Sequence, residues 1–283
     1  MAASRWAKFC LQPERRRTIL RNNDEENNNR IPRRVRNELR IRPIEVVSKR
    51  KIADCFYRIE FAGEALAGFA SLGFDDHIKV FFPDPESGAL HMPEVTEQGV
   101  TWKDGVRPTG RDYTPLYFDE RQNRLTIDFY IHQGGVASDW ATQAQPGDAL
   151  AVGGPRGSLI VPTDYAFQLY VCDETGLPAF KRRQRSIRAE HVKLFAFTDE
   201  AAGRAYLDNL SGVAASWLGS GKMQPENLTG LIAELDSIDL PDEDYFIWLT
   251  GEGDAVKKLS DYFIEQRALD PDFVRAVAYW HRK

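Results

Sequence analysis

Arg111, Tyr113 and Thr114 stand within four residues and combine three groups that suit a flavin nucleotide. The Arg111 guanidinium can neutralise a pyrophosphate, and the Tyr113 ring offers a flat surface to an isoalloxazine or ribityl chain. Thr114 supplies a small hydroxyl that can lie near the flavin N5. In an extended segment Arg111 and Tyr113 point to one face and Thr114 to the other. The same run also fits an ordinary surface strand, so it predicts a flavin site only together with other features.

A glycine pair opens a short helical segment at residues 134–144. Gly134 and Gly135 precede Ala137 and Ser138, and the helix is expected to end before a Pro-Gly-Asp sequence. The first turn of a helix presents unpaired N–H groups and a positive dipole end, which together attract an anion such as a pyrophosphate. We expect Ser138 to cap this helix. The alternative is an ordinary junction between a loop and a helix.

Glycine also surrounds a cation in the Gly-Gly-Pro-Arg-Gly-Ser run at 153–158. Two interpretations remain open for this run. Its glycines can bend the chain between two domains, or they can bring Arg156 to an anionic substrate.

In the second half of the chain, polar residues follow two apolar segments that are expected to be strands. Thr175 begins a helical segment directly after one, and Glu252 follows another. Ligands of open α/β sheets bind at the carboxyl ends of the strands. We therefore expect Thr175 and Glu252 to contact a pyridine nucleotide, although no G-x-G-x-x-G fingerprint follows the first strand.

The elements that position these groups fall into two patterns. Between residues 44 and 162, short alternating segments separated by turns are typical of antiparallel strands, and a small closed barrel satisfies them without exposed edges. In one segment Ile78, Val80 and Phe82 share a face, and Lys79 lies on the other. After residue 162, expected strands alternate with expected helices: strands at 167–172, 191–197, 212–218, 245–249 and 274–280, and helices at 177–189, 200–210, 228–235 and 254–267. This alternation predicts a parallel, doubly wound sheet.

The charge of the chain is unevenly distributed. The 283 residues carry a net charge of −5, but residues 1–51 carry +9 and the remainder carries −14. A basic arm on an acidic body can contact nucleic acid, or it can draw in an anionic ligand. The body is acidic and lacks the basic and aromatic surface of a nucleic-acid module, so we do not expect a nucleic-acid partner. We expect no membrane partner either, because no apolar run approaches the length of a membrane helix. Residues 1–29 include a long polar run and are predicted to be a disordered extension.

Cysteine and histidine usage argues against a protein-bound metal. Cys10, Cys55 and Cys172 lack metal-ligand spacing and suggest no disulfide framework, and the five histidines show no ligand spacing either. The N-terminus has no secretory apolar region, and no apolar run approaches membrane length. We therefore expect a cytoplasmic protein with no metal ligands of its own.

Several runs taken together resemble the siderophore-interacting protein family. They are 71–83 (Ser-Leu-Gly-Phe-Asp-Asp-His-Ile-Lys-Val-Phe-Phe-Pro), 111–115 (Arg-Asp-Tyr-Thr-Pro), 128–132 (Asp-Phe-Tyr-Ile-His), the 134–147 segment and 279–281 (Tyr-Trp-His). The resemblance covers about residues 30–283 in order. Members commonly carry arginine two positions after the motif threonine, where this chain has Leu116.

The resemblance implies a six-stranded antiparallel FAD-binding barrel at 30–160 and an NAD(P)H-binding α/β domain at 161–283. It also implies that NADPH reduces ferric iron held by a siderophore, with the flavin rather than a protein side chain carrying the chemistry. Arg111, Tyr113 and Thr114 resemble the flavin motif, and three residues resemble a second flavin-contacting segment: His132, Ala137 and Ser138. Three basic residues resemble those that hold the anionic chelate: Lys79, Arg156 and Arg275.

Each of these three basic residues also fits a solvated surface charge. Ferric catecholates are anionic, so cations near an exposed flavin edge would raise the local substrate concentration. Two alternatives stay open: a flavin oxidoreductase with another electron acceptor, and a siderophore-binding protein without turnover.

Overall fold

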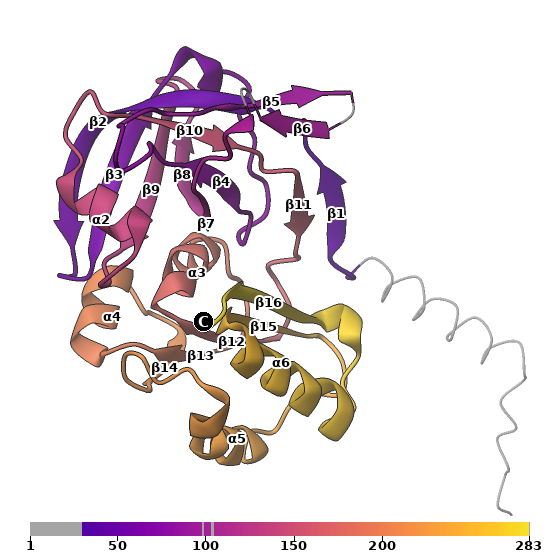
Figure 1. Cartoon of the computed structure of the whole chain (residues 1–283). Helices are drawn as coiled ribbons and strands as arrows, with labels where there is room; N and C mark the ends of the chain where they lie inside the picture. The colour runs from indigo at the N-terminus through magenta and orange to yellow at the C-terminus, as the bar shows by residue number, and fades with distance from the viewer. Residues whose placement is uncertain (1–29, 98, 103–104, 283) are drawn as a thin grey trace, which may run out of the picture.

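The first half of the chain is built almost entirely of strands (Figure 1). The computed structural model describes residues 30–97, 99–102 and 105–282, so the predicted extension at 1–29 lies outside the described residues. The elements of this half are β1 (Arg33–Arg36), β2 (Ile41–Ile52), β3 (Phe56–Ala62), η1 (Glu64–Leu66), β4 (Ile78–Phe81), β5 (Pro93–Thr96), β6 (Gly99–Trp102), β7 (Gly110–Tyr113), β8 (Pro115–Asp119), β9 (Arg124–Tyr130), α2 (Val136–Gln143), β10 (Ala149–Gly153) and β11 (Gly157–Ile160).

An antiparallel sheet of seven strands forms the barrel, in the order β7-β4-β10-β2-β3-β9-β8. Its two outermost strands, β7 and β8, are separated in sequence only by Thr114, so chain continuity closes the sheet on itself. The predicted antiparallel barrel is confirmed, with one difference: Thr114 separates β7 from β8, which lie at opposite ends of the strand order, so the sheet has seven strands instead of six. Side chains alternate as expected, since Ile78 and Val80 are fully buried and Lys79 is exposed.

The second half alternates strands and helices around a parallel sheet. The elements are β12 (Phe167–Asp173), η3 (Glu174–Gly176), α3 (Leu177–Gln184), β13 (His191–Phe197), α4 (Glu200–Leu207), β14 (Val213–Trp217), η4 (Pro225–Asn227), α5 (Thr229–Asp236), β15 (Tyr245–Glu252), α6 (Gly253–Asp261), η5 (Tyr262–Gln266), η6 (Pro271–Phe273) and β16 (Val274–Trp280). The order β14-β13-β12-β15-β16 confirms the doubly wound sheet. Its topological switch point lies between β12 and β15, because β13 and β14 were added on one side of β12 and β15 and β16 on the other.

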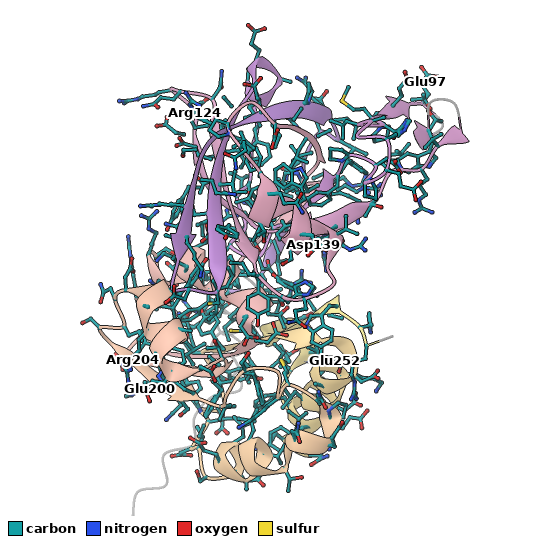
Figure 2. All side chains as sticks on the ribbon, turned by 60° about the vertical axis from the view of Figure 1, so that its left-hand side comes forward. Glu97, Arg124, Asp139, Glu200, Arg204 and Glu252 are labelled. Atoms are coloured by element: carbon teal, nitrogen blue, oxygen red, sulfur yellow. The ribbon has the colours of Figure 1, made fainter. Side chains whose placement is uncertain are left out.

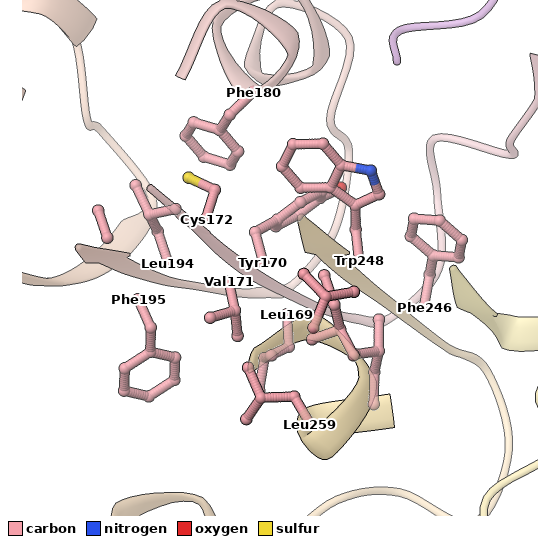
Figure 3. Close-up of a cluster of buried hydrophobic side chains, with 14 of the residues drawn as sticks. Leu169, Tyr170, Val171, Cys172, Phe180, Leu194, Phe195, Phe246, Trp248 and Leu259 are labelled. Atoms are coloured by element: carbon pink, nitrogen blue, oxygen red, sulfur yellow. The ribbon is translucent and has the colours of Figure 1, made fainter. Parts of the chain in front are cut away.

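Helices cover both faces of this sheet, and its central strand is buried on both. Figure 3 shows Tyr170 and Cys172 pointing to the side of Phe180 on α3, while Leu169 lies on the side of Leu259 on α6. The rings of Tyr170 and Phe180 have centroids 5.0 Å apart. A strand buried on both faces is a continuous apolar run, which is why β12 was recognisable from sequence.

Three expected helices end earlier or change form, and the one expected at 200–210 ends at Leu207. The basic segment expected at 177–189 is helical only to Gln184, and Ser186 then bonds back to the Arg183 carbonyl at 3.0 Å. The helix expected at 254–267 begins at Gly253 and widens into the π-helical turn η5 from Tyr262. None of the helices in the described part of the chain is long and apolar enough to cross a membrane.

Candidate active site

The Arg111–Thr114 motif lies where β7 passes into β8. Arg111 is exposed, Tyr113 is half-buried and Thr114 is buried at 6% exposure. The Tyr113 ring lies against Phe129 of the barrel core, with centroids 4.5 Å apart. Burial raises the pKa of the Tyr113 phenol, so the ring stays neutral over the physiological range. The motif therefore presents a cation and a partly open aromatic ring at one end of the barrel.

Helix α2 lies at the same end of the barrel. Its Trp140 packs on Phe129 with ring centroids 5.9 Å apart, so Phe129 joins the Tyr113 motif to the helix. Gly135 is the N-cap residue and no side chain caps the helix. Uncapped N–H groups and the helix dipole favour an anion at this terminus. Figure 2 shows Asp139 of α2 at the end of the barrel turned toward the second domain.

The expectation that Ser138 caps α2 is wrong. Ser138 lies inside the helix at 1% exposure, and its hydroxyl accepts a 2.9 Å hydrogen bond from the backbone N–H of His132. A Cβ on Gly135 would come within 2.3 Å of the His132 ring, so a larger residue at this N-cap would require the exposed His132 side chain to move. Ser138 therefore positions the His132 segment over the helix terminus and leaves that terminus uncapped.

An open pocket of about 660 Å³ lies beside Arg111, on the outer face of the barrel. It contains two of the expected chelate-binding residues, Lys79 and Arg156, together with Arg111. The remaining described lining residues come from the β1–β2 connection, the start of β2, β4 and the residue before it, β6, the loop before β7, β7 itself and the end of β10. They are Leu39, Ile41, His77, Phe81, Val100, Trp102, Arg107, Pro108, Thr109, Gly110, Asp112 and Gly153. Arg111 thus belongs both to the flavin motif and to the pocket.

The three expected chelate-binding cations have different surroundings. Arg156 is exposed, and Lys79 pairs with Asp112 at 2.8 Å while about half of each side chain stays exposed. Arg275 does not line the pocket among the residues described. Its Nε donates a 3.0 Å hydrogen bond to Asp75, a carboxylate with only 2% of its side chain exposed.

At the carboxyl edge of the parallel sheet, the expected nucleotide contacts flank the switch point. Thr175 follows β12, and both its N–H and its hydroxyl donate to Asp173 Oδ1. Glu252 ends β15, where one oxygen caps α6 through Ala255 N at 2.9 Å. The other oxygen, Oε1, is buried without a hydrogen-bond partner among the described residues. A Cβ on Gly251 would lie 2.8 Å from Asp173, so the two strand ends are in close contact.

The C-terminal segment covers this edge. Trp280 donates a 2.6 Å hydrogen bond from Nε1 to Asp173, and a Cβ on Gly253 would come within 2.1 Å of the His281 ring. Asp173 was not singled out from the sequence, yet it holds both Thr175 and Trp280. Its position directly after an apolar strand and before a glycine turn was the available signal.

A buried carboxylate, Glu174, lies next to these groups. The Ser220 hydroxyl donates a hydrogen bond to its Oε1. Burial raises the pKa of Glu174 to about 7, and the nearby charges of Asp173 and Asp199 act in the same direction. Sequence reasoning gave Glu174 no role, because nothing in its sequence neighbourhood shows that it is buried.

The two domains are joined through charged side chains. Arg58 of β3 makes two hydrogen bonds to Asp128 of β9, at 2.8 and 2.7 Å, and Tyr206 of α4 donates a third at 2.6 Å. On the other side, Arg182 of α3 donates to the carbonyls of Ser71 and Pro115 at 3.0 and 2.8 Å. These contacts hold the barrel end against the parallel sheet.

The 71–76 loop, which belongs to one of the runs that resemble the family, has a structural role. Asp76 accepts hydrogen bonds from the hydroxyls of Ser158 and Ser71 and from Gly73 N, at 2.6, 2.9 and 3.0 Å. Its neighbour Asp75 takes the Arg275 contact from the second domain. Two adjacent acids inside a β-rich, glycine-containing run were the signal for this junction.

These residues fit an FAD. An uncapped helix terminus at a glycine N-cap and an exposed Arg111 suit its phosphates, and the half-open Tyr113 ring suits its isoalloxazine. The barrel end that holds them faces the carboxyl edge of a parallel sheet, which is where nucleotides bind. Fold and site therefore define a two-domain flavin nucleotide reductase.

Comparison with known proteins gives the family. Residues 45–159 match the siderophore-interacting FAD-binding domain and residues 165–283 match the siderophore-interacting protein domain. The chain belongs to the siderophore-interacting protein family. It is 51% identical over 259 residues to the NADPH-dependent ferric-chelate reductase of Escherichia coli, covering 90% of this chain and 98% of that protein.

More distant relatives agree with this assignment. The ferric vibriobactin reductase of Vibrio cholerae is 26% identical, over 85% of this chain and 89% of that protein. The crystal structure of a siderophore utilization protein from T. fusca superposes with a TM-score of 0.78 at 32% identity, covering 89% of this chain and 96% of that one.

Proposed function

We propose that this chain is an FAD-dependent ferric-siderophore reductase that uses NADPH to reduce chelated Fe(III) to Fe(II) in the cytoplasm. The observation that carries the proposal is the shared position of Arg111, which belongs to the flavin motif and also lines the cationic pocket. A chelate in that pocket would lie beside the flavin. The 51% identity to an NADPH-dependent ferric-chelate reductase supports the same reaction.

Each domain has a distinct task in this proposal. Residues 30–160 bind FAD, with Arg111 and the first turn of α2 on the phosphates, Tyr113 along the isoalloxazine and Thr114 near N5. His132, Ala137 and Ser138 shape the second contact segment. Bound FAD supplies the conversion of a two-electron hydride donor into single electrons. The protein's own side chains bind and orient the reactants.

Residues 161–283 bind NADPH at the switch point of the parallel sheet. Thr175 and Glu252 lie on the two strands that flank that point, and the unpartnered Glu252 Oε1 is available to accept a hydrogen bond from a ribose hydroxyl. Because Trp280 and His281 cover this edge, the C-terminal segment must move when the nucleotide binds.

The substrate is an anionic iron chelate, and we propose a catecholate. Lys79 and Arg156 line the pocket, and arginine offers forked hydrogen bonds to planar, oxygen-rich ligands. Arg275 acts from the second domain, where its Nε bonds to Asp75. Because the body of the chain carries −14, these local cations are needed to attract an anion.

An absorbance titration tests the proposal. Purified protein should show flavin bands that bleach on anaerobic addition of NADPH and recover on addition of a ferric catecholate, with Fe(II) caught by a ferrous chelator. Bleaching without recovery on any ferric chelate would instead indicate an oxidoreductase with another acceptor. Absence of bound flavin would leave a siderophore-binding protein without turnover.

A salt titration tests the roles of the pocket cations. Lys79→Ala or Arg156→Ala should raise KM for an anionic chelate several-fold and leave FAD bound, and the difference from wild type should shrink as salt screens the charges. Wild-type kinetics that do not change with salt would contradict this role.

A further inference from the structure

One wall of the cationic pocket comes from a hairpin that the proposed function does not use. Within the described part of the chain, strands β5 and β6 pair only with each other, as a separate two-stranded sheet with Val95 opposite Val100 and Pro93 opposite Trp102. Val100 and Trp102 line the pocket, whereas Thr101 between them is exposed and does not. The strand alternation therefore directs a valine and a tryptophan into the pocket.

Trp102 is held in place by two neighbours that also line the pocket. Its ring meets Phe81 of β4 edge to face, with centroids 6.2 Å apart. The guanidinium carbon of Arg107 lies 5.6 Å from the centroid of the Trp102 ring. Such a cation–aromatic contact favours a fixed relative placement of the two groups. The pocket thus presents a flat aromatic surface and a guanidinium side by side.

The charges of the pocket give Arg107 a distinct position. Its described lining holds the cations Lys79, Arg107, Arg111 and Arg156 against one carboxylate, Asp112, which pairs with Lys79. Arg111 belongs to the flavin motif. Arg107, in contrast, lies against the ring of Trp102 and belongs to the pocket wall on the side of the hairpin.

We propose that Trp102 and Arg107 form a specificity element that selects ferric chelates carrying aryl rings with anionic oxygens. The proposal rests on the proposed function, since it names the substrate class of the same pocket. Aromatic rings prefer offset or edge-to-face contact with other rings, and guanidinium groups bind planar oxygen-rich anions through forked hydrogen bonds. An aryl chelate satisfies both groups at once, whereas an aliphatic chelate of the same charge satisfies only Arg107.

Chelate binding to the oxidised, FAD-loaded protein tests this selectivity directly. Without NADPH no iron is reduced, so bound iron can be measured after ultrafiltration and gives a Kd. Two probes separate the two groups: ferric tris(2,3-dihydroxybenzoate), which is anionic and aromatic, and ferric citrate, which is anionic and aliphatic. Thr101→Ala is the matched control, because it changes the same strand on the face turned away from the pocket.

Trp102→Ala should weaken binding of the aryl chelate about tenfold and change the Kd for ferric citrate less than about twofold. Trp102→Phe keeps an aromatic face and should recover most of the lost affinity. Arg107→Ala should weaken both probes about tenfold, because both are anions, and Arg107→Lys should recover part of that loss. Thr101→Ala should bind both probes as wild type does.

Two results would overturn the proposal: wild-type affinity of Trp102→Ala for the aryl chelate, or equal loss of both probes in that variant. Equal loss would mean that Trp102 only supports the pocket wall. The proposed function is checked separately on wild-type protein, by NADPH bleaching of the bound flavin and its recovery with ferric citrate. If that cycle operates while Trp102→Ala shows the wild-type preference for the aryl chelate over ferric citrate, the specificity element alone is refuted.

Discussion

The arginines of the pocket and the arginines of the domain junction differ in exposure and in pairing. Arg107, Arg111 and Arg156 are exposed around an open cavity. Arg58 and Arg275, by contrast, are directed at carboxylates with almost no exposed surface, Asp128 and Asp75. A cation in water is available to a ligand, whereas a cation paired with a buried carboxylate is needed to compensate that charge.

This contrast explains why a count of basic residues identifies no ligand site. The resemblance grouped Arg275 with Lys79 and Arg156, yet the structure gives Arg275 a firm contact across the domain junction. Two measurements therefore separate the two possible roles of Arg275. A loss of stability in a variant reports its role in joining the domains, and a rise in KM reports a role in binding the chelate.

The largest expected effect is at the centre of the junction. Asp128→Ala leaves the Arg58 guanidinium and the Tyr206 hydroxyl without their shared acceptor, and loss of one partner from a buried pair costs about 3–5 kcal/mol. Urea unfolding should show this loss. The control Glu200→Ala breaks an exposed pair with Arg204 and should cost less than about 1 kcal/mol. If Asp128→Ala and Glu200→Ala lowered the free energy of unfolding equally, the junction pair would be worth no more than an exposed surface pair.

Arg275→Ala should give an intermediate loss. Among the described residues, it leaves the Asp75 carboxylate only the 3.4 Å hydrogen bond from Trp248 Nε1. We expect about 2–3 kcal/mol lower stability, because Arg275 is itself partly exposed. Arg156→Ala should leave the free energy of unfolding unchanged within about 0.5 kcal/mol and raise KM. A destabilised Arg156→Ala would place that residue with the junction instead.

Glu174, at the carboxyl edge of the parallel sheet, adds a pH dependence to the stability. Its pKa is about 7 in the folded protein against 4.5 as the ordinary value, so the folded state binds the proton more tightly. Stability therefore falls as the pH rises from about 4.5 to 7, by about 3 kcal/mol from this group. Unfolding free energies of Glu174→Gln measured at pH 5 and pH 8 should differ less than those of wild type. An identical pH dependence in the variant would contradict the assignment.

The smallest expected effect is on the hydrogen bond of Ser138 in helix α2, at the proposed FAD site. Ser138 lies in the first turn of α2, which has no side-chain cap. Ser138→Ala removes the acceptor of the His132 N–H and should lower the free energy of unfolding by about 1 kcal/mol. FAD affinity, measured by ultrafiltration of the flavin, should fall a few-fold as the His132 segment loosens. Ser138→Thr keeps the hydroxyl and serves as the matched control; a loss of the same size there would indicate packing rather than the hydrogen bond.

Local patterns predicted much of this molecule correctly. The alternation of Ile78, Lys79 and Val80, the continuous apolar run of β12 and the glycine pair before α2 each depend on neighbours within one element, so the sequence shows them directly. The Ser138 cap was wrong for a related reason. A serine near a helix start is a good cap by statistics, but here its hydroxyl is taken by a backbone N–H six residues earlier.

By itself, the sequence determined the order of the antiparallel and parallel sheets and the faces of the strands, because these follow from periodicity along the chain. The residues of the flavin motif remain a prediction. Only the tertiary structure decided which cations stay available and which are paired. Arg275 and Asp75 are 200 residues apart, and Trp102 meets Phe81 through a hairpin that folds back on the barrel. Charge pairing and burial depend on distance in space, which the linear order of residues does not encode.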